Sequence, residues 1–128
     1  MPKRKGTILA ICAHNDDQLI GAGGTLAKYS AAGWRVRTLI CSFGESSHPH
    51  LRGPVVAAIR VKEALDADRI LGGAGLEFLG LTEGKFPLQF KEKRIPDKVL
   101  RTIRAEKPAK IFIIFCLIEL CKVFYISP

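Results

Sequence analysis

A chain of 128 residues is long enough for one domain with one hydrophobic core and too short for two. A hydrophobic fraction of 48% and a charged fraction of 25% are those of an ordinary globular protein. The charge is basic, with 20 Lys and Arg against 12 Asp and Glu, and much of the excess lies in residues 91–110. No aromatic residues alternate with these cations, so we expect a solvated helix face and no nucleic-acid site.

The first half of the chain alternates apolar runs with helical patterns. Residues 7–13, TILAICA, form the continuous apolar run of a buried parallel strand. Apolar residues then recur at mostly helical spacing over residues 19–32, and residues 34–43 predict a second strand. A polar loop, residues 44–53, precedes a predicted helix over residues 54–71, which opens on a proline.

The second half continues the alternation. We expect a short strand over residues 76–81, a loop over 82–94, a helix over 95–106 and a buried strand over 110–115. This pattern predicts an α/β fold, a Rossmann-like three-layer α/β/α arrangement around a parallel sheet. With the expected strand order 3-2-1-4, the sheet reverses direction between strands one and four. The carboxyl end of the first strand then lies at the switch point, where ligands bind.

Five polar residues, HNDDQ at positions 14–18, directly follow the first predicted strand. The adjacent carboxylates of Asp16 and Asp17 repel each other unless they are exposed or offset by a cation. One interpretation is a divalent metal held by His14 and one aspartate, with the other aspartate as a base. The alternative is a solvated turn with a helix N-cap, and these five residues alone leave both readings open.

Two nearby features have competing interpretations. The Gly-rich residues 21–24 do not complete a G-x-G-x-x-G motif, because its last glycine would fall at Leu26. We expect these glycines to let the helix pack closely beneath the site. His48 and His50 lie in the polar loop, where they could reach a metal or could be two solvated imidazoles.

The HNDDQ motif and the glycines after it resemble the A-H-P-D-D-E…G-G signature of the LmbE-like (PIG-L-type) deacetylases. The similarity covers residues 7–112 and continues through Arg60-x-x-Glu63, Leu71-Gly72, Phe78-Leu79-Gly80 and Ile103-Arg104-x-x-x-Pro108.

The resemblance implies a zinc-dependent hydrolase that removes acetyl groups from N-acetylglucosaminyl-type sugars. It implies that His14 and Asp17 bind the metal and that Asp16 is the general base. It also implies that Arg60 lies near the substrate. A catalytic zinc site has three protein ligands and an open position for water. His14 and Asp17 would therefore supply two of the three ligands.

Three departures from the family pattern stand out. Asn15 replaces the proline of the motif, and we expect this to change only the stiffness of the loop. Gln18 replaces the glutamate, which removes a charge but keeps a hydrogen-bonding head. The family takes its third metal ligand from a histidine shortly after the fourth strand, and residues 113–122 contain no histidine.

The apolar tail after Phe115 does not resemble the family. We therefore expect residues 1–128 to be a single LmbE-like deacetylase domain that lacks the C-terminal part of the family fold and has weak or absent activity. Because exposed apolar edges invite pairing, we expect the tail to pack on the sheet or against another copy, giving a homo-oligomer. The tail contains Glu119 and Lys122 and is shorter than the roughly 20 residues of a membrane-spanning helix, so we expect no membrane anchor.

The four cysteines lack C-x-x-C spacing, and the charged start of the chain does not have the pattern of a secretory signal. We therefore expect buried, free thiols in a cytoplasmic protein.

Three classes of function compete. The first is a zinc-dependent deacetylase with an N-acetylated sugar as its substrate. The second is a non-catalytic, truncated Rossmann-like domain that binds a ligand or a partner chain. The third, a nucleotide-binding module, is weakened by the glycine spacing and by the lack of an acidic residue at the end of the second strand. Zinc content and the release of acetate distinguish these classes.

Overall fold

The computed structural model describes residues 3–83, 85–117 and 120–126. Within them, five strands form one sheet in the order β3-β2-β1-β4-β5. Four strands run parallel, namely β1 (Thr7–Cys12), β2 (Arg35–Ser42), β3 (Leu76–Leu81) and β4 (Lys110–Leu117). The predicted α/β fold and strand order 3-2-1-4 are confirmed.

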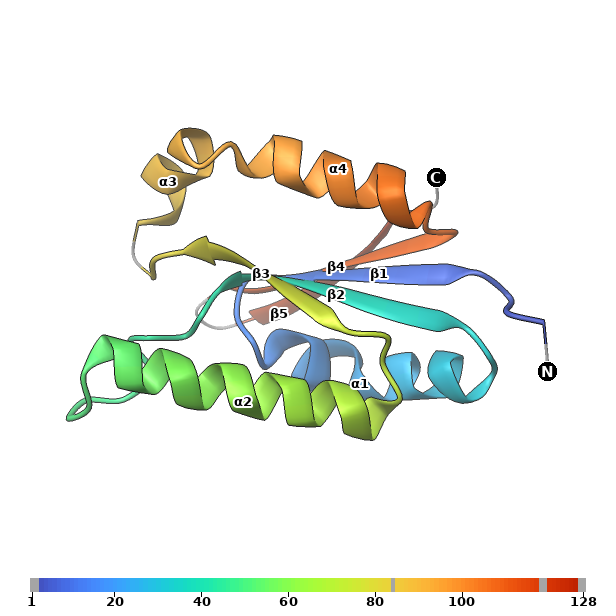
Figure 1. The fold of residues 1–128 in the computed structure, drawn as a ribbon, viewed down its shortest axis with the longest axis horizontal. Helices are drawn as coiled ribbons and strands as arrows, with labels where there is room; N and C mark the ends of the chain where they lie inside the picture. The colour runs from blue at the N-terminus through green and yellow to red at the C-terminus, as the bar shows by residue number, and fades with distance from the viewer. Residues whose placement is uncertain (1–2, 84, 118–119, 127–128) are drawn as a thin grey trace.

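Helices cover both faces of this sheet (Figure 1). The helices α1 (Asp17–Ala31) and α2 (Gly53–Leu71) lie on one face, and α3 (Phe86–Glu92) and α4 (Ile95–Glu106) lie on the other. The crossovers before β3 therefore use one face, and the crossover from β3 to β4 uses the opposite face. This change of face makes the gap between β1 and β4 the switch point of the sheet. No helix among the described residues is long and apolar enough to span a membrane.

The central strand β1 is buried on both of its faces, which explains its continuous apolar sequence. Ile8, Ala10 and Cys12 pack toward α1, in a cluster that includes Ala22 and Leu26. The alternate residues of β1, Leu9 and Ile11, pack with Leu39 on the other face, where side chains of α4 cover them. The alternation follows from the two-residue period of a strand.

Two elements differ from the sequence prediction. The predicted loop over residues 82–94 contains the helix α3, which is only seven residues long and so too short to show a helical period. Pro87 in its first turn favours helical backbone angles. Gln89 also ties α3 back to the end of β3, because its Oε1 accepts the backbone N–H of Thr82 at 2.6 Å.

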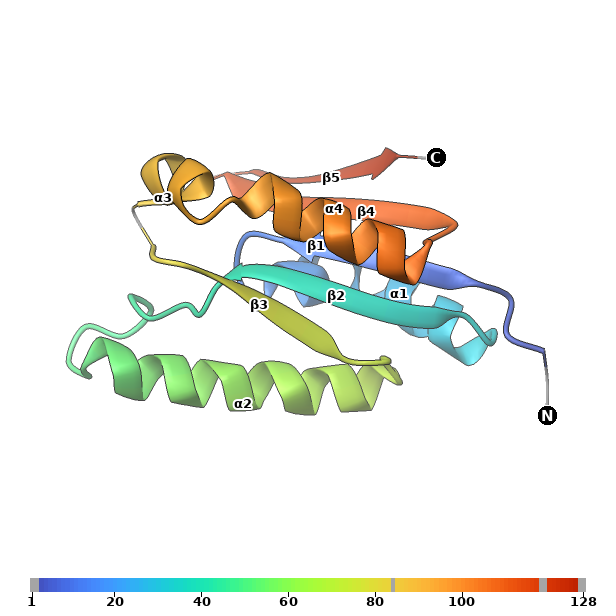
Figure 2. The same cartoon turned by 45° about the horizontal axis from the view of Figure 1, so that its top comes forward.

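The tail forms a fifth strand, β5 (Leu120–Ile126), antiparallel to β4 (Figure 2). The paired positions run from Ile111 with Ile126 to Leu117 with Leu120. We expected the tail to pack on the sheet or against another copy, without a strand of its own, and it extends the sheet as an edge strand beside β4. The predicted homo-oligomer stays a prediction.

Cys12 and Cys41 are buried and free, as predicted. Burial raises the pKa of the Cys41 thiol to about 11, and it also raises the pKa of Cys12. Neither thiol is therefore ionised at neutral pH, and both behave as small apolar side chains.

The expectation that the glycines of α1 allow close packing is wrong for Gly23 and Gly24. A Cβ atom added at Gly24 meets no atom within 4 Å, and one added at Gly23 meets only the backbone O of Gln18, at 3.9 Å. One glycine that the fold does require is Gly72, the C-cap of α2, with φ of 72°. A Cβ there would lie 2.5 Å from Oγ of Ser30, which itself donates to the backbone O of Gly72.

We predict opposite effects for two alanine substitutions. Gly24→Ala should raise the free energy of unfolding by about 0.5–1 kcal/mol, because alanine loses less conformational entropy in a helix. Gly72→Ala should lower it by about 1 kcal/mol or more, because of left-handed backbone strain and the Ser30 contact. Urea denaturation of both variants measures the difference, and destabilisation by Gly24→Ala would contradict our account of α1.

Candidate active site

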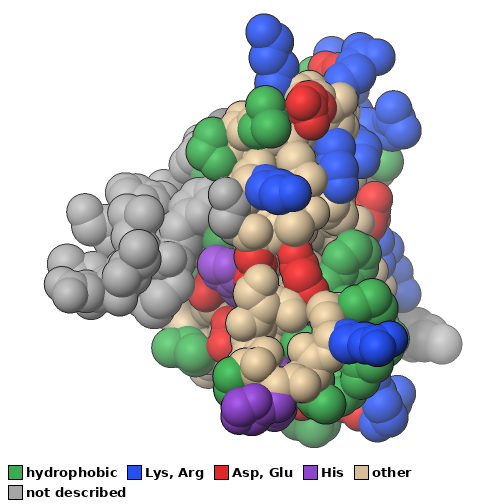
Figure 3. Space-filling model, turned by 90° about the vertical axis from the view of Figure 1, so that its left-hand side faces the viewer, with side chains coloured by type: hydrophobic (Ala, Val, Ile, Leu, Met, Phe, Trp, Pro, Cys, Tyr) green, Lys and Arg blue, Asp and Glu red, His purple; other side chains and the backbone are tan. Residues whose placement is uncertain are grey.

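The polar residues 14–18 lie at the carboxyl end of β1, between the strand and the first turn of α1. This is the switch point of the sheet. Figure 3 views this end of the molecule and shows acidic side chains near its middle, histidine side chains beside and below them, and most of the Lys and Arg side chains toward the α3 and α4 side. The charge of this face is therefore mixed, in contrast to the net positive charge of the chain.

A cavity of about 340 Å³ opens at this place. It is lined by His14, Asn15, Asp16, Asp17, Ile20, Gly44, Ser47, Arg60 and Glu83. All four residues predicted for the site, His14, Asp16, Asp17 and Arg60, are among them. The lining comes from the loops after three neighbouring strands, from the first turn of α1 and from α2, which holds Arg60.

Asp17 is the buried carboxylate of the pair, with a side chain that is 3% exposed. Its Oδ2 accepts the backbone N–H of His14 at 2.9 Å and lies 3.8 Å from Nδ1 of the same residue. Burial raises the pKa of Asp17 above its ordinary value, and the neighbouring Asp16 adds to the effect, while the contacts with His14 oppose it. A cation at this carboxylate would offset the cost of burying its charge.

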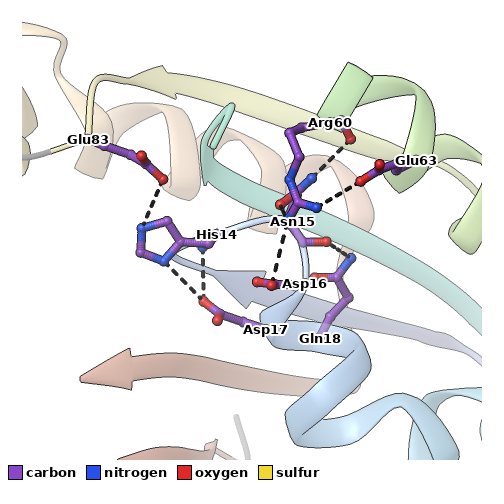
Figure 4. Close-up of polar contacts among 8 residues, drawn as sticks. All are labelled: His14, Asn15, Asp16, Asp17, Gln18, Arg60, Glu63 and Glu83. Carbon is purple, nitrogen blue, oxygen red and sulfur yellow. Dashed lines mark hydrogen bonds and ion pairs between the residues drawn. The ribbon is translucent and has the colours of Figure 1, made fainter. Parts of the chain in front are cut away.

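The imidazole of His14 lies between two carboxylates (Figure 4). Its Nδ1 faces Asp17, and its Nε2 lies 3.5 Å from Oε1 of Glu83. The ring of Phe86, in the first turn of α3, stacks on it with a centroid distance of 5.8 Å. The ring is thus held in orientation on three sides while its side chain is 36% exposed to the cavity.

Asp16 is the open carboxylate of the pair, with a side chain that is 48% exposed. It is the N-cap residue of α1, yet its side chain makes no capping hydrogen bond. The alternative interpretation, in which the Asp16 side chain caps the helix, is therefore wrong. Instead its Oδ2 lies 3.5 Å from Nη2 of Arg60, at the cavity.

Asn15 changes more than the stiffness of the loop, so the expectation for this departure from the family motif is wrong. Its side chain forms two hydrogen bonds with Arg60, across 45 positions of sequence. Gln18 donates from Nε2 to the backbone O of Asn15 at 2.9 Å, which keeps the hydrogen-bonding role expected of it. Arg60 also pairs with Glu63 on its own helix at 2.7 Å.

Glu83 is the site residue that the sequence did not single out. Its Oε2 accepts the backbone N–H of Ser46 at 2.9 Å, and its own backbone N–H donates to Oε1 of Glu45 at 2.8 Å. These reciprocal bonds join the loop after β2 to the loop after β3 and place Glu83 opposite His14. The signal in the sequence is its position two residues after β3. We call the edge of the sheet formed by the carboxyl ends of β1, β2 and β3 the rim, and Glu83 and His14 both lie on it.

The donor set fits zinc in part. His14 and Asp17 lie close enough to share one ion, because Nδ1 of His14 is 3.8 Å from Oδ2 of Asp17. Among the described residues, no group of three or more His, Cys, Asp or Glu side chains is arranged to hold a metal. His48 and His50 are exposed, and Nδ1 of His48 accepts the backbone N–H groups of His50 and Leu51, both at 3.1 Å.

One family model and several curated relatives match this chain. The family model described as PIG-L, GlcNAc-PI de-N-acetylase, matches residues 9–117. The chain is 34% identical over 92 residues to a 1D-myo-inositol 2-acetamido-2-deoxy-alpha-D-glucopyranoside deacetylase of Salinispora arenicola, with 67% of this chain covered. It is 38% identical over 82 residues to the protein of the same name from Streptomyces scabiei, with 57% of this chain covered.

The fold is similar to that of the N,N'-diacetylchitobiose deacetylase from Pyrococcus horikoshii, solved with its inhibitor MPG. The TM-score is 0.74 at 29% sequence identity, and the match covers 82% of this chain and 39% of that chain. The matched region is 28% of the length of the Salinispora protein and 25% of the Streptomyces protein. The chain therefore spans less than half the length of these relatives.

We predict that Asp17→Asn stabilises the metal-free protein at neutral pH, by on the order of 1 kcal/mol. The amide can still accept the N–H of His14 but needs no charge in a buried position. Because the pKa of Asp17 is raised by folding, wild-type stability should fall as the pH rises through that value. The gain from Asp17→Asn should therefore vanish in acid, below the ordinary aspartate pKa.

The matched control is Asp16→Asn, which removes an exposed carboxylate one position away. Thermal unfolding between pH 3 and pH 7 with a chelator present compares the three proteins. A loss of stability in Asp17→Asn at pH 7, larger than in Asp16→Asn, would show that the buried charge is stabilising and our account incorrect.

Proposed function

Because this chain belongs to the PIG-L family of GlcNAc-PI de-N-acetylases, we propose that its rim carries the general base and two metal ligands of a deacetylase. The proposed substrate is an N-acetylated aminosugar, the class named for the relatives from Salinispora and Pyrococcus. The proposed reaction is hydrolysis of the amide bond to acetate and a free amine.

The observation that carries the proposal is the different environment of two adjacent carboxylates. Asp17 is buried against the imidazole of His14, whereas Asp16 is half exposed at the cavity beside Arg60. A metal ligand needs a fixed, deprotonated oxygen next to a second donor, and a base needs access to water and substrate. The two aspartates meet these two requirements separately.

His14 and Asp17 are the residues that would hold zinc. When bound, the ion would supply Lewis acidity and a water that ionises near neutral pH. Glu83, facing Nε2 of His14, would accept the second ring N–H and thereby hold the tautomer in which Nδ1 is free to bind. Phe86 restrains rotation of the ring from the side of α3.

Asp16 would move the proton in the reaction. Its carboxylate takes a proton from the attacking water as the oxygen adds to the amide carbonyl carbon. It then gives this proton to the amine as the carbon–nitrogen bond breaks, so that the carboxylate returns to its starting state. Arg60 lies within reach of both Asp16 and the cavity, where it could donate to a sugar hydroxyl or to the acetyl oxygen.

Two measurements test this proposal. Isothermal titration with zinc, in the wild type and in His14→Ala, establishes whether the rim binds the ion. Release of acetate is then followed from N-acetylglucosaminyl-inositol and from N,N'-diacetylchitobiose. Zinc binding that depends on His14, together with acetate release, supports a deacetylase. Zinc-independent binding of either sugar without acetate release supports the non-catalytic, ligand-binding alternative instead.

We predict that Asp16→Asn keeps zinc affinity but lowers the rate of acetate release by about 10²–10⁴-fold, because the base is lost and the ligands remain. Asp17→Asn, the matched control, should lose zinc affinity as well. Titration calorimetry and an acetate assay on both variants measure the two effects. Equal loss of zinc in both variants would remove the proposed division of roles.

For Glu83→Gln we predict a fall in zinc affinity of about 10–100-fold, because a ligating histidine depends on the carboxylate behind it. Glu77→Gln is the matched control, since Glu77 is an exposed residue of β3 that does not line the site cavity. An unchanged zinc affinity in Glu83→Gln would leave Glu83 as a link between loops and nothing more.

A further inference from the structure

The side-chain amide of Asn15 forms two hydrogen bonds with Arg60. Its Nδ2 donates to the backbone O of Arg60 at 3.0 Å, and its Oδ1 accepts from Nη2 of Arg60 at 2.7 Å. Asn15 is only 3% exposed, so these bonds form away from solvent. The first bond fixes the amide to the helix backbone, and the second fixes the guanidinium to the amide. We refer to this pair of bonds as the Asn15 clasp.

The clasp decides where the guanidinium points. Arg60 has two carboxylate neighbours, Glu63 at 2.7 Å and Asp16 at 3.5 Å. The Glu63 side chain is 53% exposed and three positions along the same helix, a surface pair of low net energy. Without the clasp, nothing in the described residues except the longer Asp16 contact would draw Arg60 away from Glu63.

The loop after β2 makes room for the clasp. Gly44 has φ of 70°, and a Cβ added there would lie 3.4 Å both from Nε of Arg60 and from Oδ1 of Asn15. Nε itself is buried and has no hydrogen-bond partner among the described residues. The orientation of the guanidinium therefore depends on its two Nη groups, and Nη2 is the one that Asn15 holds.

A proline at position 15, as in the family motif, has no side-chain group that could form the clasp. The clasp is thus a property of this chain and not of the motif. Gln18 also stabilises the clasp, because its hydrogen bond to the backbone O of Asn15 fixes the backbone that carries the Asn15 side chain.

We propose that Asn15 is a positioning residue, which fixes the Arg60 guanidinium between Asp16 and the cavity so that the cation meets substrate in one orientation. The inference rests on the proposed function for its role in the reaction, although the clasp itself does not. Arg60 is the group that touches substrate, and Asn15 acts through it. A pre-oriented guanidinium loses less freedom when the substrate binds and as charge develops in the reaction.

The experiment is nitrogen-detected NMR of the arginine side chains in the metal-free full chain. In the wild type we expect resolved Nη signals for Arg60, with slow rotation of the guanidinium. In Asn15→Ala this rotation should speed up by about tenfold or more, the effect of losing one hydrogen bond to a charged group. Glu63→Gln, which leaves the clasp intact, should keep the slow rotation.

Arg69 is the reference within each spectrum, because its side chain is 80% exposed and its ion pair in the described part of the chain is a surface contact with Asp66. Asn15→Pro, the family residue at this position, serves as a second variant if Asn15→Ala does not fold. Slow rotation of Arg60 in whichever variant folds would overturn the proposal.

The kinetic arm separates this inference from the proposed function. If the wild type releases acetate, Asn15→Ala should lower kcat by about tenfold with a smaller change in KM. An unchanged kcat, with Arg60 loosened, would overturn the positioning role. If the wild type releases no acetate, the proposed function fails, and the NMR measurement alone decides whether Asn15 positions Arg60.

Discussion

The site depends on the position of β1 in the sheet. β1 is paired on both sides, with β2 and with β4, and is covered on both faces by helices. Its end therefore cannot move without disturbing the core. Because the crossovers leave β1 on one face and return to β4 on the other, none of the described crossover helices runs over that end. A rigid strand that ends in an open cavity lets five consecutive polar residues hold fixed positions.

The position at the end of β1 also gives the two adjacent carboxylates different environments. Asp16 and Asp17 are adjacent in the chain, but the start of α1 turns one outward and the other inward. The outward carboxylate, Asp16, lies near the guanidinium of Arg60. The inward one, Asp17, contacts the backbone N–H and the imidazole of His14. Two groups of equal intrinsic acidity thus acquire different properties from their surroundings alone. Burial of Asp17 is a local cost to the fold that a bound cation would offset.

The sequence predicts what is local and periodic. The four parallel strands follow from apolar runs, and the position of His14, Asp16 and Asp17 follows from their place after the first run. The short helix α3 and the strand β5 were not predicted, because one lacks a full period and the other depends on the edge of β4 for a partner. The roles of Asn15 and Glu83 were not predictable either. Their partners lie far away in sequence, and no local pattern marks a hydrogen bond between two loops.

The pairing of β1 with β4 also has a consequence for how the chain folds. Ile8 pairs with Lys110, so the central strand receives its second neighbour only from the far end of the domain. The described contacts of the rim, in contrast, lie within residues 14–86. During synthesis, the rim and its helices α1 and α2 can therefore assemble while one edge of β1 is still open. Such long-range closure is slow. Until β4 arrives, the nascent chain presents an apolar strand edge that could pair with another chain.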